Sequence, residues 1–588
     1  MGLIALGGPF LLALVVSLGA TRLCERFAQR IGLVAHPRED RWHRESVPML
    51  GGVAIMAAVL VAGVGLGGHL TRFAPLVVLS LAMGAVGLAD DVKTLRPQTK
   101  LAAQIVGAAL LIRFGTLLPL TPFSLLNLFL TLFWMVAITN AFNLLDNMDG
   151  LAAGVAAVAA VFRLSVFLVD GDRDGAWMMA VLLGAASGFL VRNCPPAKIF
   201  MGDAGSLFLG FLLAGMSLVS DYAYTRGVVA VLVFPTLLVL VPILDTAFVT
   251  VTRLVSGRSV AQGGRDHTSH RLVALGMSER KTLTLLLGVS VVSGVLAILS
   301  YHHGLEYSII LLALLVIWLA LLGAHLGRVH VMSAATTKEP AATVRFVNDF
   351  PYKRQVATLG IDAILIVVAY YAAYLLRFEA AFESERANFL QSVAPVLVLQ
   401  ILALAASGSY RGLWRYTSVS DLLRLCRAAT TGVGASVVYL VFTTRFETFS
   451  RVIFVLDWVL LILLLNGSRV AFRLLGEWLR PRSRTSRRTL IYGAGDGGAL
   501  TLRELRNNAD LARQPVGFLD DDRQKRGRRI YGLPILGGLD AAEAIFAIQQ
   551  VEEVIVASQK ISPERLERLS AMCTASGVLV TRASLWIR

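Results

Sequence analysis

Long apolar runs separated by short polar segments make up most of the chain. A helix needs about 20 apolar residues to cross a bilayer, so runs of this length predict membrane-spanning helices. We expect eleven such helices before a basic segment and four after it, in a polytopic α-helical membrane protein. The predicted spans are 3–21, 50–69, 73–89, 101–118, 122–142, 151–169, 176–191, 205–220, 228–250, 282–300, 305–325, 356–376, 389–407, 428–445 and 452–470.

From about residue 481 the pattern changes to short apolar runs that alternate with helical stretches, which predicts a soluble α/β domain. Before residue 481, the clearest boundary is the basic segment that follows the eleventh predicted span. The sequence therefore predicts a membrane domain over 1–326, a linker over 327–353, a four-helix membrane segment over 354–480 and a Rossmann-like domain over 481–588.

Composition agrees with this division. Of the 588 residues, 56% are hydrophobic and 16% are charged, and the net charge is +16. The arginines are scattered over loops between apolar runs, so we expect the lipid bilayer and phosphate-bearing substrates as partners and no nucleic acid. The four cysteines lie far apart without a CxxC pair, which indicates neither a zinc site nor a disulfide framework.

Basic residues concentrate in loops that follow odd-numbered predicted helices. Segment 22–49 carries six arginines and segment 253–280 carries five, whereas the loops after even-numbered helices are short and poor in Lys and Arg. Cytoplasmic loops of membrane proteins are enriched in Lys and Arg. The odd-numbered loops and the C-terminal domain are therefore predicted to face the cytoplasm.

The dense polar motifs lie in these same odd-numbered loops. Adjacent carboxylates repel unless a cation or a shared proton offsets them, and an acid at the end of a membrane helix is costly unless it has a role. Mg²⁺ binds carboxylates while bridging substrate phosphates, and basic side chains complement phosphate. The motifs therefore predict metal-dependent phosphoryl transfer. The candidate residues are Asp90, Asp91, Lys100, Asn143, Asp146, Asp149, Asp203, His267, His270 and Arg271.

Each motif has a simpler interpretation when it is taken alone. Asp90 and Asp91 are then a solvated helix end, Asp203 is a turn residue, and the histidines lie on the surface. Arg163, inside an apolar run, is expected to reach the outer face of the membrane. A transporter or flippase for lipid-linked sugars is the alternative function. Transporters place ionisable residues near mid-helix, however, whereas these residues lie in the loops of one face.

In this order the motifs resemble those of the polyprenyl-phosphate N-acetylhexosamine-1-phosphate transferase family, and most of all its WecA-like branch. The lipid I synthases of peptidoglycan assembly are a more distant branch. Asn147 stands where the family more often has glycine, and the last motif has two histidines where the lipid I branch has three, which favours WecA-like substrates. The matching segments are Pro48 to Gly52, Asp90 and Asp91 with Lys100 and Gln104, Asn140 to Leu151, Asn193 to Ser206, and Asp266 to Leu272.

The resemblance implies that a UDP-N-acetylhexosamine, such as UDP-GlcNAc, reacts with undecaprenyl phosphate to give a polyprenyl-diphospho-sugar and UMP. This reaction initiates a lipid-linked cell-surface polysaccharide at a bacterial inner (plasma) membrane. The implied cofactor is Mg²⁺, with Mn²⁺ as a substitute, and a homodimer is left open. We prefer direct attack by the lipid phosphate to a covalent aspartyl intermediate, because it needs only positioning and charge neutralisation.

The same resemblance assigns roles to the candidate residues. Asp203 would hold Mg²⁺ with Asp90 and Asp91 as further metal candidates, and one of that pair would deprotonate or orient the lipid phosphate. His267 is also a candidate catalytic residue. The implied substrate ligands are Asn143, Asp146 and Asp149 for the nucleotide, with Asp149 at the uracil edge, and Lys100, His267, His270 and Arg271 for the pyrophosphate.

The C-terminal domain begins with a predicted strand over 489–492. The glycines Gly493, Gly495 and Gly498 and a helix follow, and a second strand ends in Asp520. A glycine-rich turn between strand and helix, with an acid at the next strand end, is typical of dinucleotide-binding Rossmann folds. NAD or a nucleotide sugar is therefore the candidate ligand, and a module that binds nothing is the alternative.

The segments Phe350–Arg354, Leu375–Phe378 and Tyr410–Tyr416 resemble the membrane part of the CapD-like nucleotide-sugar dehydratases, although an amphipathic interfacial segment is the simpler interpretation of the last. Those dehydratases carry a second, catalytic domain with a lysine-containing motif. Neither Tyr492 nor Tyr531 has a lysine four residues on. We therefore expect regulatory binding, with a bifunctional nucleotide-sugar modifying enzyme as the alternative.

Overall fold

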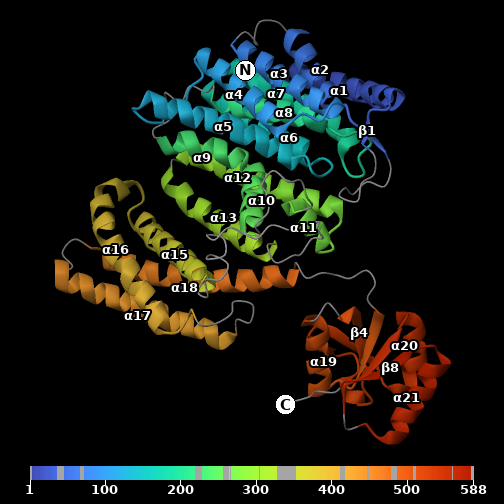
Figure 1. Cartoon of the computed structure of the whole chain (residues 1–588). Coiled ribbons are helices and arrows are strands. Elements are labelled where there is room, and N and C mark those ends of the chain that lie inside the picture. The colour runs from blue at the N-terminus through green and yellow to red at the C-terminus, as the bar shows by residue number, and fades with distance from the viewer. Residues whose placement is uncertain are drawn as a thin grey trace. The chain divides into compact units, whose positions relative to one another are not determined.

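The computed structural model divides into two compact units, Met1–Leu479 and Arg480–Arg588 (Figure 1). The predicted linker, apart from Lys353, and the segment 411–416 lie outside the described residues. The structure describes residues 3–35, 46–65, 72–118, 120–218, 228–255, 264, 266–303, 305–326, 353–410, 418–445, 449–478, 487–507, 511–558 and 561–583.

Every predicted span contains a helix, and in the described residues eleven helices are long and apolar enough to cross a membrane. The predicted span 228–250 is divided at Val239, because Pro242 has no N–H to donate to the Leu238 carbonyl. The helices of the first unit are α1 (Leu3–Ile31), α2 (Gly51–Gly65), α3 (Ala74–Val92), α4 (Pro97–Arg113), α5 (Ser124–Leu145), α6 (Leu151–Asp170), α7 (Arg173–Asn193), α8 (Gly202–Met216), α9 (Val228–Leu238), α10 (Leu240–Val255), α11 (Thr268–Ala274), α12 (Glu279–His303), α13 (Leu305–Leu326), α15 (Lys353–Phe378), α16 (Phe382–Ala406), α17 (Val419–Thr444) and α18 (Arg451–Trp478).

The short helix α8 packs between α2, α3 and α5, and its residues from Ala204 to Met216 are all buried. Glycines allow its neighbours to approach closely. A Cβ atom at Gly52 of α2 would overlap the backbone of Gly205, and one at Gly87 of α3 would overlap the Asp203 carbonyl. The N-terminal end of α8 is thereby held against α2 and α3.

Arg163 of α6 is buried, so the expectation that it reaches the outer face of the membrane was wrong. Only 3% of its surface is exposed, and Nη2 donates a hydrogen bond to the Met216 carbonyl (3.1 Å). Its guanidinium lies over the rings of Phe167 and Phe234, 4.6 and 5.3 Å from their centroids. Side chains and a carbonyl of the helix bundle therefore contact Arg163, in place of the membrane–water interface at which it was expected to lie.

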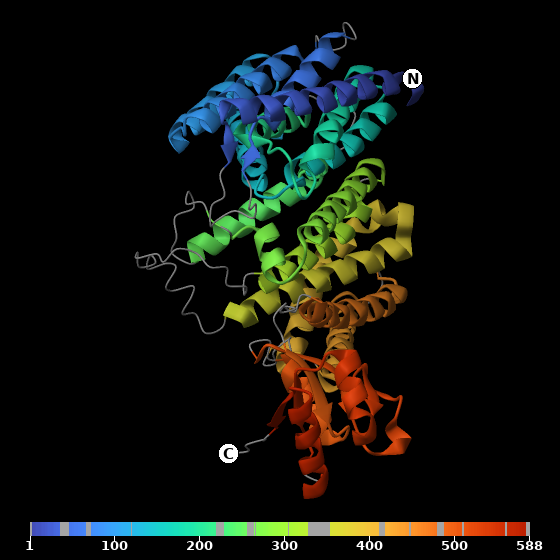
Figure 2. The ribbon, with the colours of Figure 1, turned by 90° about the vertical axis from the view of Figure 1, so that its right-hand side faces the viewer.

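Helices α15 to α18 form a second group with its own hydrophobic cluster, which also takes in Ile317 and Leu321 of α13 (Figure 2). Tyr370 and Tyr374 of α15 pack against Phe389 of α16 in this cluster. The four helices predicted after the basic segment therefore pack together, in contact with the last helix before it.

The second unit is an α/β domain with a six-stranded sheet in the order β5-β6-β4-β3-β7-β8, parallel except for the β5–β6 pair. Leu490 and Tyr492 of β3 enter one hydrophobic cluster and Ile491 enters another, because successive side chains point to opposite faces. The predicted Rossmann-like fold is confirmed. Its elements are β3 (Arg487–Tyr492), α19 (Asp496–Asn507), β4 (Arg513–Leu519), β5 (Arg529–Ile530), β6 (Leu533–Gly537), α20 (Ala542–Gln549), β7 (Glu553–Val556), α21 (Pro563–Ala575) and β8 (Leu579–Arg582).

Candidate active site

One lysine joins two carboxylates from different helices at the end of α3. Lys100 Nζ of α4 donates hydrogen bonds to Asp90 Oδ2 (2.8 Å) and to Asp203 Oδ2 of α8 (2.9 Å). Asp90 Oδ1 also accepts the Leu95 N–H, which fixes the turn before Pro97 begins α4. The side chains of Lys100, Asp90 and Asp203 are 22%, 11% and 29% exposed. The cluster is thus open to ligands, and with both carboxylates ionised it carries one negative charge more than its lysine offsets.

Asp91 has a different environment from Asp90, although the two are adjacent in sequence. Its Oδ1 and Oδ2 accept the N–H groups of Asp203 (2.9 Å) and Ala204 (3.1 Å) at the start of α8. A carboxylate is favourable there, because helix N-terminal N–H groups lack partners and carry partial positive charge. Gly202 has φ +72°, and a Cβ there would press on the Asp91 carboxylate. Asp91 therefore fixes the backbone that presents Asp203.

The loop before α8 is held in place on both sides. On one side, Phe200 N–H donates to the Pro48 carbonyl (2.8 Å), and Gly51 N–H donates to the Phe200 carbonyl (2.9 Å). On the other, Asp149 Oδ2 accepts the Ala197 N–H (2.8 Å). Three predicted motifs therefore meet in this loop, and Asp149 contacts its backbone.

Helix α5 extends the site through its amides. Asn143 Nδ2 donates to Ser206 Oγ of α8 (3.0 Å), and the side chains of Gln104 and Asn140 pair through both of their amide groups (2.6 and 3.3 Å). Asp146, half-buried, caps the C-terminal end of α5, where its N–H donates to the Phe142 carbonyl (3.2 Å). The predicted nucleotide ligands therefore lie at the end of α5 that reaches α8.

A second polar cluster centres on Asp245 of α10, which the sequence analysis missed. Asp245 Oδ2 lies 2.8 Å from His267 Nδ1, and Oδ1 accepts the Thr268 N–H (2.7 Å). Asn147, just after α5, joins this cluster: its Oδ1 accepts the Ser269 hydroxyl (2.5 Å) and its Nδ2 lies 3.5 Å from Asp245 Oδ2. An acid inside an apolar run is a functional candidate in itself, and that pattern would have identified Asp245.

The two histidines are buried and adjacent, with ring centroids 6.2 Å apart. Arg271 instead binds main-chain carbonyls, with Nε on Asp266 (3.0 Å) and Nη1 on Leu326 (2.8 Å). Asp266 itself receives two hydrogen bonds from Arg253 (2.9 and 2.8 Å). Burial alone would raise the pKa of Asp266, but the Arg253 guanidinium outweighs it and lowers that pKa below its usual value. These arginines organise the segment that presents the histidines.

Residues 73–221 match the family model of glycosyl transferase family 4. This range contains Asp90, Lys100 and Asp203 of the lysine–carboxylate cluster. The chain is 31% identical over 342 residues to a probable undecaprenyl-phosphate N-acetylglucosaminyl 1-phosphate transferase of Bacillus subtilis, a match that covers 56% of this chain and 94% of the relative. The chain belongs to glycosyl transferase family 4.

Other relatives agree with this family assignment and extend it. The chain is 35% identical over 315 residues to the decaprenyl-phosphate N-acetylglucosaminephosphotransferase of Mycobacterium leprae, over 47% of this chain and 79% of the relative. It is also 30% identical over 228 residues to a probable polysaccharide biosynthesis protein of Bacillus subtilis, over 38% of this chain and 37% of that relative. Residues 405–581 match a CoA-binding domain, from the end of α16 to the last strand. The predicted resemblance is confirmed for both parts of the chain.

A divalent metal can bind at this site only if its side chains supply suitable coordinating atoms. Within the described part of the chain, no group of three or more His, Cys, Asp or Glu side chains is arranged around a metal position. Mg²⁺ needs only one or two carboxylates, because waters and substrate phosphates complete its coordination. Asp90 and Asp203 supply two hard oxygen donors that already converge on one cation, Lys100. These residues fit the metal.

The glycine-rich turn of the C-terminal unit is tightly closed on one side. Gly493 has φ +106°, and a Cβ at Gly498 would overlap the Gly493 carbonyl, whereas nothing lies within 4 Å of a Cβ at Gly495. Asp520 accepts hydrogen bonds from the Ala494 N–H (2.8 Å) and from Lys525 (3.0 Å). Burial would raise the pKa of Asp520, but the hydrogen bond from the Asp522 N–H (2.9 Å) and these two bonds outweigh it and lower that pKa. The predicted ligand role of Asp520 stays a prediction, and its present partner is the glycine turn itself.

Proposed function

We propose that this protein transfers N-acetylhexosamine 1-phosphate from a UDP-sugar, UDP-GlcNAc or a related UDP-HexNAc, to undecaprenyl phosphate and releases UMP. The names of its relatives support transfer of N-acetylglucosamine 1-phosphate to a polyprenyl phosphate. The observation that carries the proposal is Lys100 held between Asp90 and Asp203, because it assembles carboxylates and a cation from three helices in one open cluster. The product would initiate a lipid-linked cell-surface polysaccharide.

In the proposed reaction, an oxygen of the lipid phosphate attacks the β-phosphorus of the UDP-sugar. The bond from that phosphorus to the bridging oxygen breaks, and UMP leaves with the electron pair. Asp203 and Asp90 would hold Mg²⁺, which offsets the negative charge of the diphosphate when it is bound. Lys100 would donate to the phosphate oxygens, and Asp90 would orient the lipid phosphate. Asp91 would act through the position of Asp203.

The second cluster, around Asp245, would contact another part of the UDP-sugar. His267, oriented by Asp245, would donate to the diphosphate together with His270. Asn143, Asp146 and Asp149 would contact the nucleotide. Positioning and charge neutralisation suffice for such a transfer, so no covalent aspartyl intermediate is needed.

The proposed location is a bacterial inner membrane, with the active site and the C-terminal domain on the cytoplasmic face. The arginine-rich loops after odd-numbered helices support this orientation. Labelling of single introduced cysteines with a membrane-impermeant maleimide tests it. A cysteine in the loop after α3 should react only after the membrane is permeabilised, and reaction in intact cells would reverse the orientation.

We propose a regulatory role for the C-terminal domain, through binding of a nucleotide-containing ligand near Gly495. Support comes from the turn between β3 and α19 and from the CoA-binding family model. Isothermal titration of the full chain with NAD, UDP-GlcNAc and coenzyme A, compared with a Gly495→Trp variant, tests it. Loss of one binding event in the variant is expected, and identical titrations for both proteins would leave the domain a scaffold.

UMP release tests the proposed reaction. Purified protein with UDP-GlcNAc, undecaprenyl phosphate and Mg²⁺ should release UMP, and a panel of UDP-sugars should identify the preferred hexosamine. EDTA should stop the reaction, and added Mg²⁺ or Mn²⁺ should restore it. Movement of a lipid-linked sugar across liposomes without UMP release from any UDP-HexNAc would favour the flippase alternative.

A further inference from the structure

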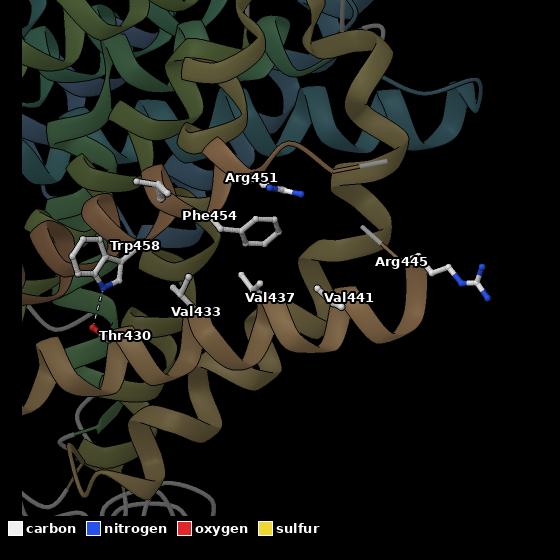
Figure 3. Close-up of a pocket in the computed structure, with 9 residues that line it drawn as sticks. Thr430, Val433, Val437, Val441, Arg445, Arg451, Phe454 and Trp458 are labelled. Atoms are coloured by element: carbon white, nitrogen blue, oxygen red, sulfur yellow. Dashed lines mark hydrogen bonds between the residues drawn. The ribbon is translucent and has the colours of Figure 1, made fainter. Parts of the chain in front are cut away.

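An open apolar groove of about 710 Å³ runs between α17 and α18 (Figure 3). Val433, Val437 and Val441, spaced four residues apart, form one stripe of α17 that faces Phe454 and Trp458 of α18. Both helices are long and apolar enough to cross a membrane. The groove therefore opens into the hydrocarbon of the bilayer.

The groove changes along its length. At one end the Trp458 indole donates a hydrogen bond to Thr430 Oγ1 (2.9 Å), which fixes the ring across the groove. Val433 and Phe454 form a buried floor, at 6% and 4% exposure, and Val441 near the other end is 45% exposed. A closed end, a floor and an open end give the shape of a site for one hydrocarbon chain.

Two arginines mark the open end. Arg445 is the C-terminal cap of α17, Arg451 is the first residue of α18, and both line the groove. Both are exposed, and within the described residues neither forms an ion pair with an acidic side chain. Glu447 lies between them in sequence, outside the described residues. Figure 3 shows Arg451 beside Phe454 at this end and the Arg445 side chain extending away from the groove, so Arg445 would have to turn inward to share a ligand with Arg451.

We propose that this groove binds a single-tailed lipid phosphomonoester, the chemical class of the polyprenyl phosphates. Inside a bilayer a tail gains little by moving from lipid to valine side chains, so the head group has to provide the selectivity. A phosphomonoester carries between one and two negative charges near neutral pH, and guanidinium groups bind phosphate through paired hydrogen bonds. Two arginines match such a dianion better than the single charge of a phosphodiester lipid.

This site is separate from the proposed active site. None of the residues of the lysine–carboxylate cluster or of the Asp245 cluster belongs to α17 or α18. The open end also follows the fourteenth predicted span, whereas the active-site loops follow odd-numbered ones. The predicted topology therefore puts the arginines at the opposite membrane face, and the groove would hold a second lipid molecule.

Photo-crosslinking tests the proposal. The full-length protein in phosphatidylcholine nanodiscs is irradiated with undecaprenyl phosphate that carries a diazirine in its tail, and labelled peptides are identified by mass spectrometry. We expect labelling of α17 and α18. The double variant Arg445→Gln with Arg451→Gln should reduce that labelling about tenfold, as expected for the loss of two exposed charge-assisted contacts. Val437→Trp, which fills the groove, should reduce it as well.

Controls separate the sources of binding. Arg473→Gln removes an exposed arginine of α18 that lies outside the groove and should leave the labelling unchanged. Unlabelled undecaprenyl phosphate should compete, while undecaprenol, phosphatidylglycerol and inorganic phosphate should not. Labelling that persists in the double variant, or equal competition by phosphatidylglycerol, overturns the proposal. UMP release measured on the same samples shows whether the reaction fails independently of the groove.

Discussion

Two groups of acidic and basic side chains in the first unit differ in charge balance and access. In the four-helix group, Arg469 of α18 binds Asp362 of α15 through two hydrogen bonds (2.6 and 2.7 Å), and the side chains are 4% and 0% exposed. In the family 4 domain, Lys100 serves two carboxylates, and all three side chains are partly exposed. In the Arg469–Asp362 pair the opposite charges are equal in number and solvent is excluded. In the Lys100 cluster the carboxylates outnumber the lysine and solvent can reach all three side chains.

The difference indicates which group is a site. Removing charges from water is costly, so a closed pair persists in a membrane protein only with matched charge and good geometry. Asp362 and Arg469 meet that condition and need no further ligand. Asp90 and Asp203 exceed the charge of their lysine and remain accessible, so a cation and a phosphate can enter. Four substitutions test this contrast, in order of decreasing expected effect.

Asp203→Asn should lower UMP release about 1,000-fold, because in the proposed reaction the removed carboxylate would hold the metal, which would supply several kcal/mol of charge stabilisation. The free energy of unfolding should stay close to that of the wild type, since the site is open. Turnover and unfolding in the same preparation measure both. Retained turnover with the usual Mg²⁺ requirement would remove Asp203 from the metal role.

Arg469→Met should have the opposite profile. It leaves Asp362 buried without its partner, so the free energy of unfolding should fall by about 3 kcal/mol. Turnover per folded molecule should remain near that of the wild type. Arg473→Met, which breaks an exposed pair with Glu477 on the same helix, is the matched control and should cost about 0.3 kcal/mol. Equal losses of unfolding free energy in Arg469→Met and Arg473→Met would contradict the proposed difference between buried and exposed pairs.

Asp266→Asn probes a closed pair beside the active site and should lower the free energy of unfolding by about 2 kcal/mol at pH 7. The pKa of Asp266 is depressed in the folded protein, so its stabilisation is present above the unfolded value, near pH 4, and is lost as pH falls through the folded value. Unfolding midpoints of both proteins between pH 7 and pH 3 should converge at low pH. A difference between the two unfolding midpoints that grows as the pH falls would contradict the predicted direction of the pH dependence.

Asp91→Asn should have the smallest effect, about a tenfold loss of turnover, because one of two capping oxygens at α8 remains an acceptor. The Mg²⁺ concentration for half-maximal activity should not change, whereas loss of a metal ligand would raise it. A magnesium titration of the variant therefore distinguishes positioning by Asp91 from ligation. A large shift in that concentration would return Asp91 to the metal site.

The hydrophobic pattern was sufficient to predict the long apolar helices and the first strands of the C-terminal sheet, because length and period report burial directly. It did not predict the short elements α11, β5 and β6. It also indicated that the loops with Asp90 and Asp203 lie together, since they follow helices of the same parity. It could not separate Asp90 from Asp91, because that difference depends on the backbone of α8, more than 100 residues away in sequence.

Two residues show what the pattern does not specify: it marks Asp245 as a candidate without its partners, and it misplaces Arg163. Asp245 lies inside an apolar run, and only its contacts with His267 and Thr268 reveal its part in the second cluster. Arg163 was expected at the membrane surface, but the rings of Phe167 and Phe234 and the Met216 carbonyl hold it in the bundle. In both cases the partner comes from a distant element, which no local pattern specifies.

The most direct test of the lysine–carboxylate cluster as a sugar-1-phosphate transfer site follows the β-phosphorus of the donor. UDP-GlcNAc labelled with radioactive phosphorus in the β position is incubated with the protein, Mg²⁺ and undecaprenyl phosphate, and the lipid fraction is extracted. We expect one labelled phosphorus in the lipid for each UMP released, and about a thousandth of that label with Asp203→Asn. Label that stays in UDP, while the sugar alone reaches the lipid, would contradict it.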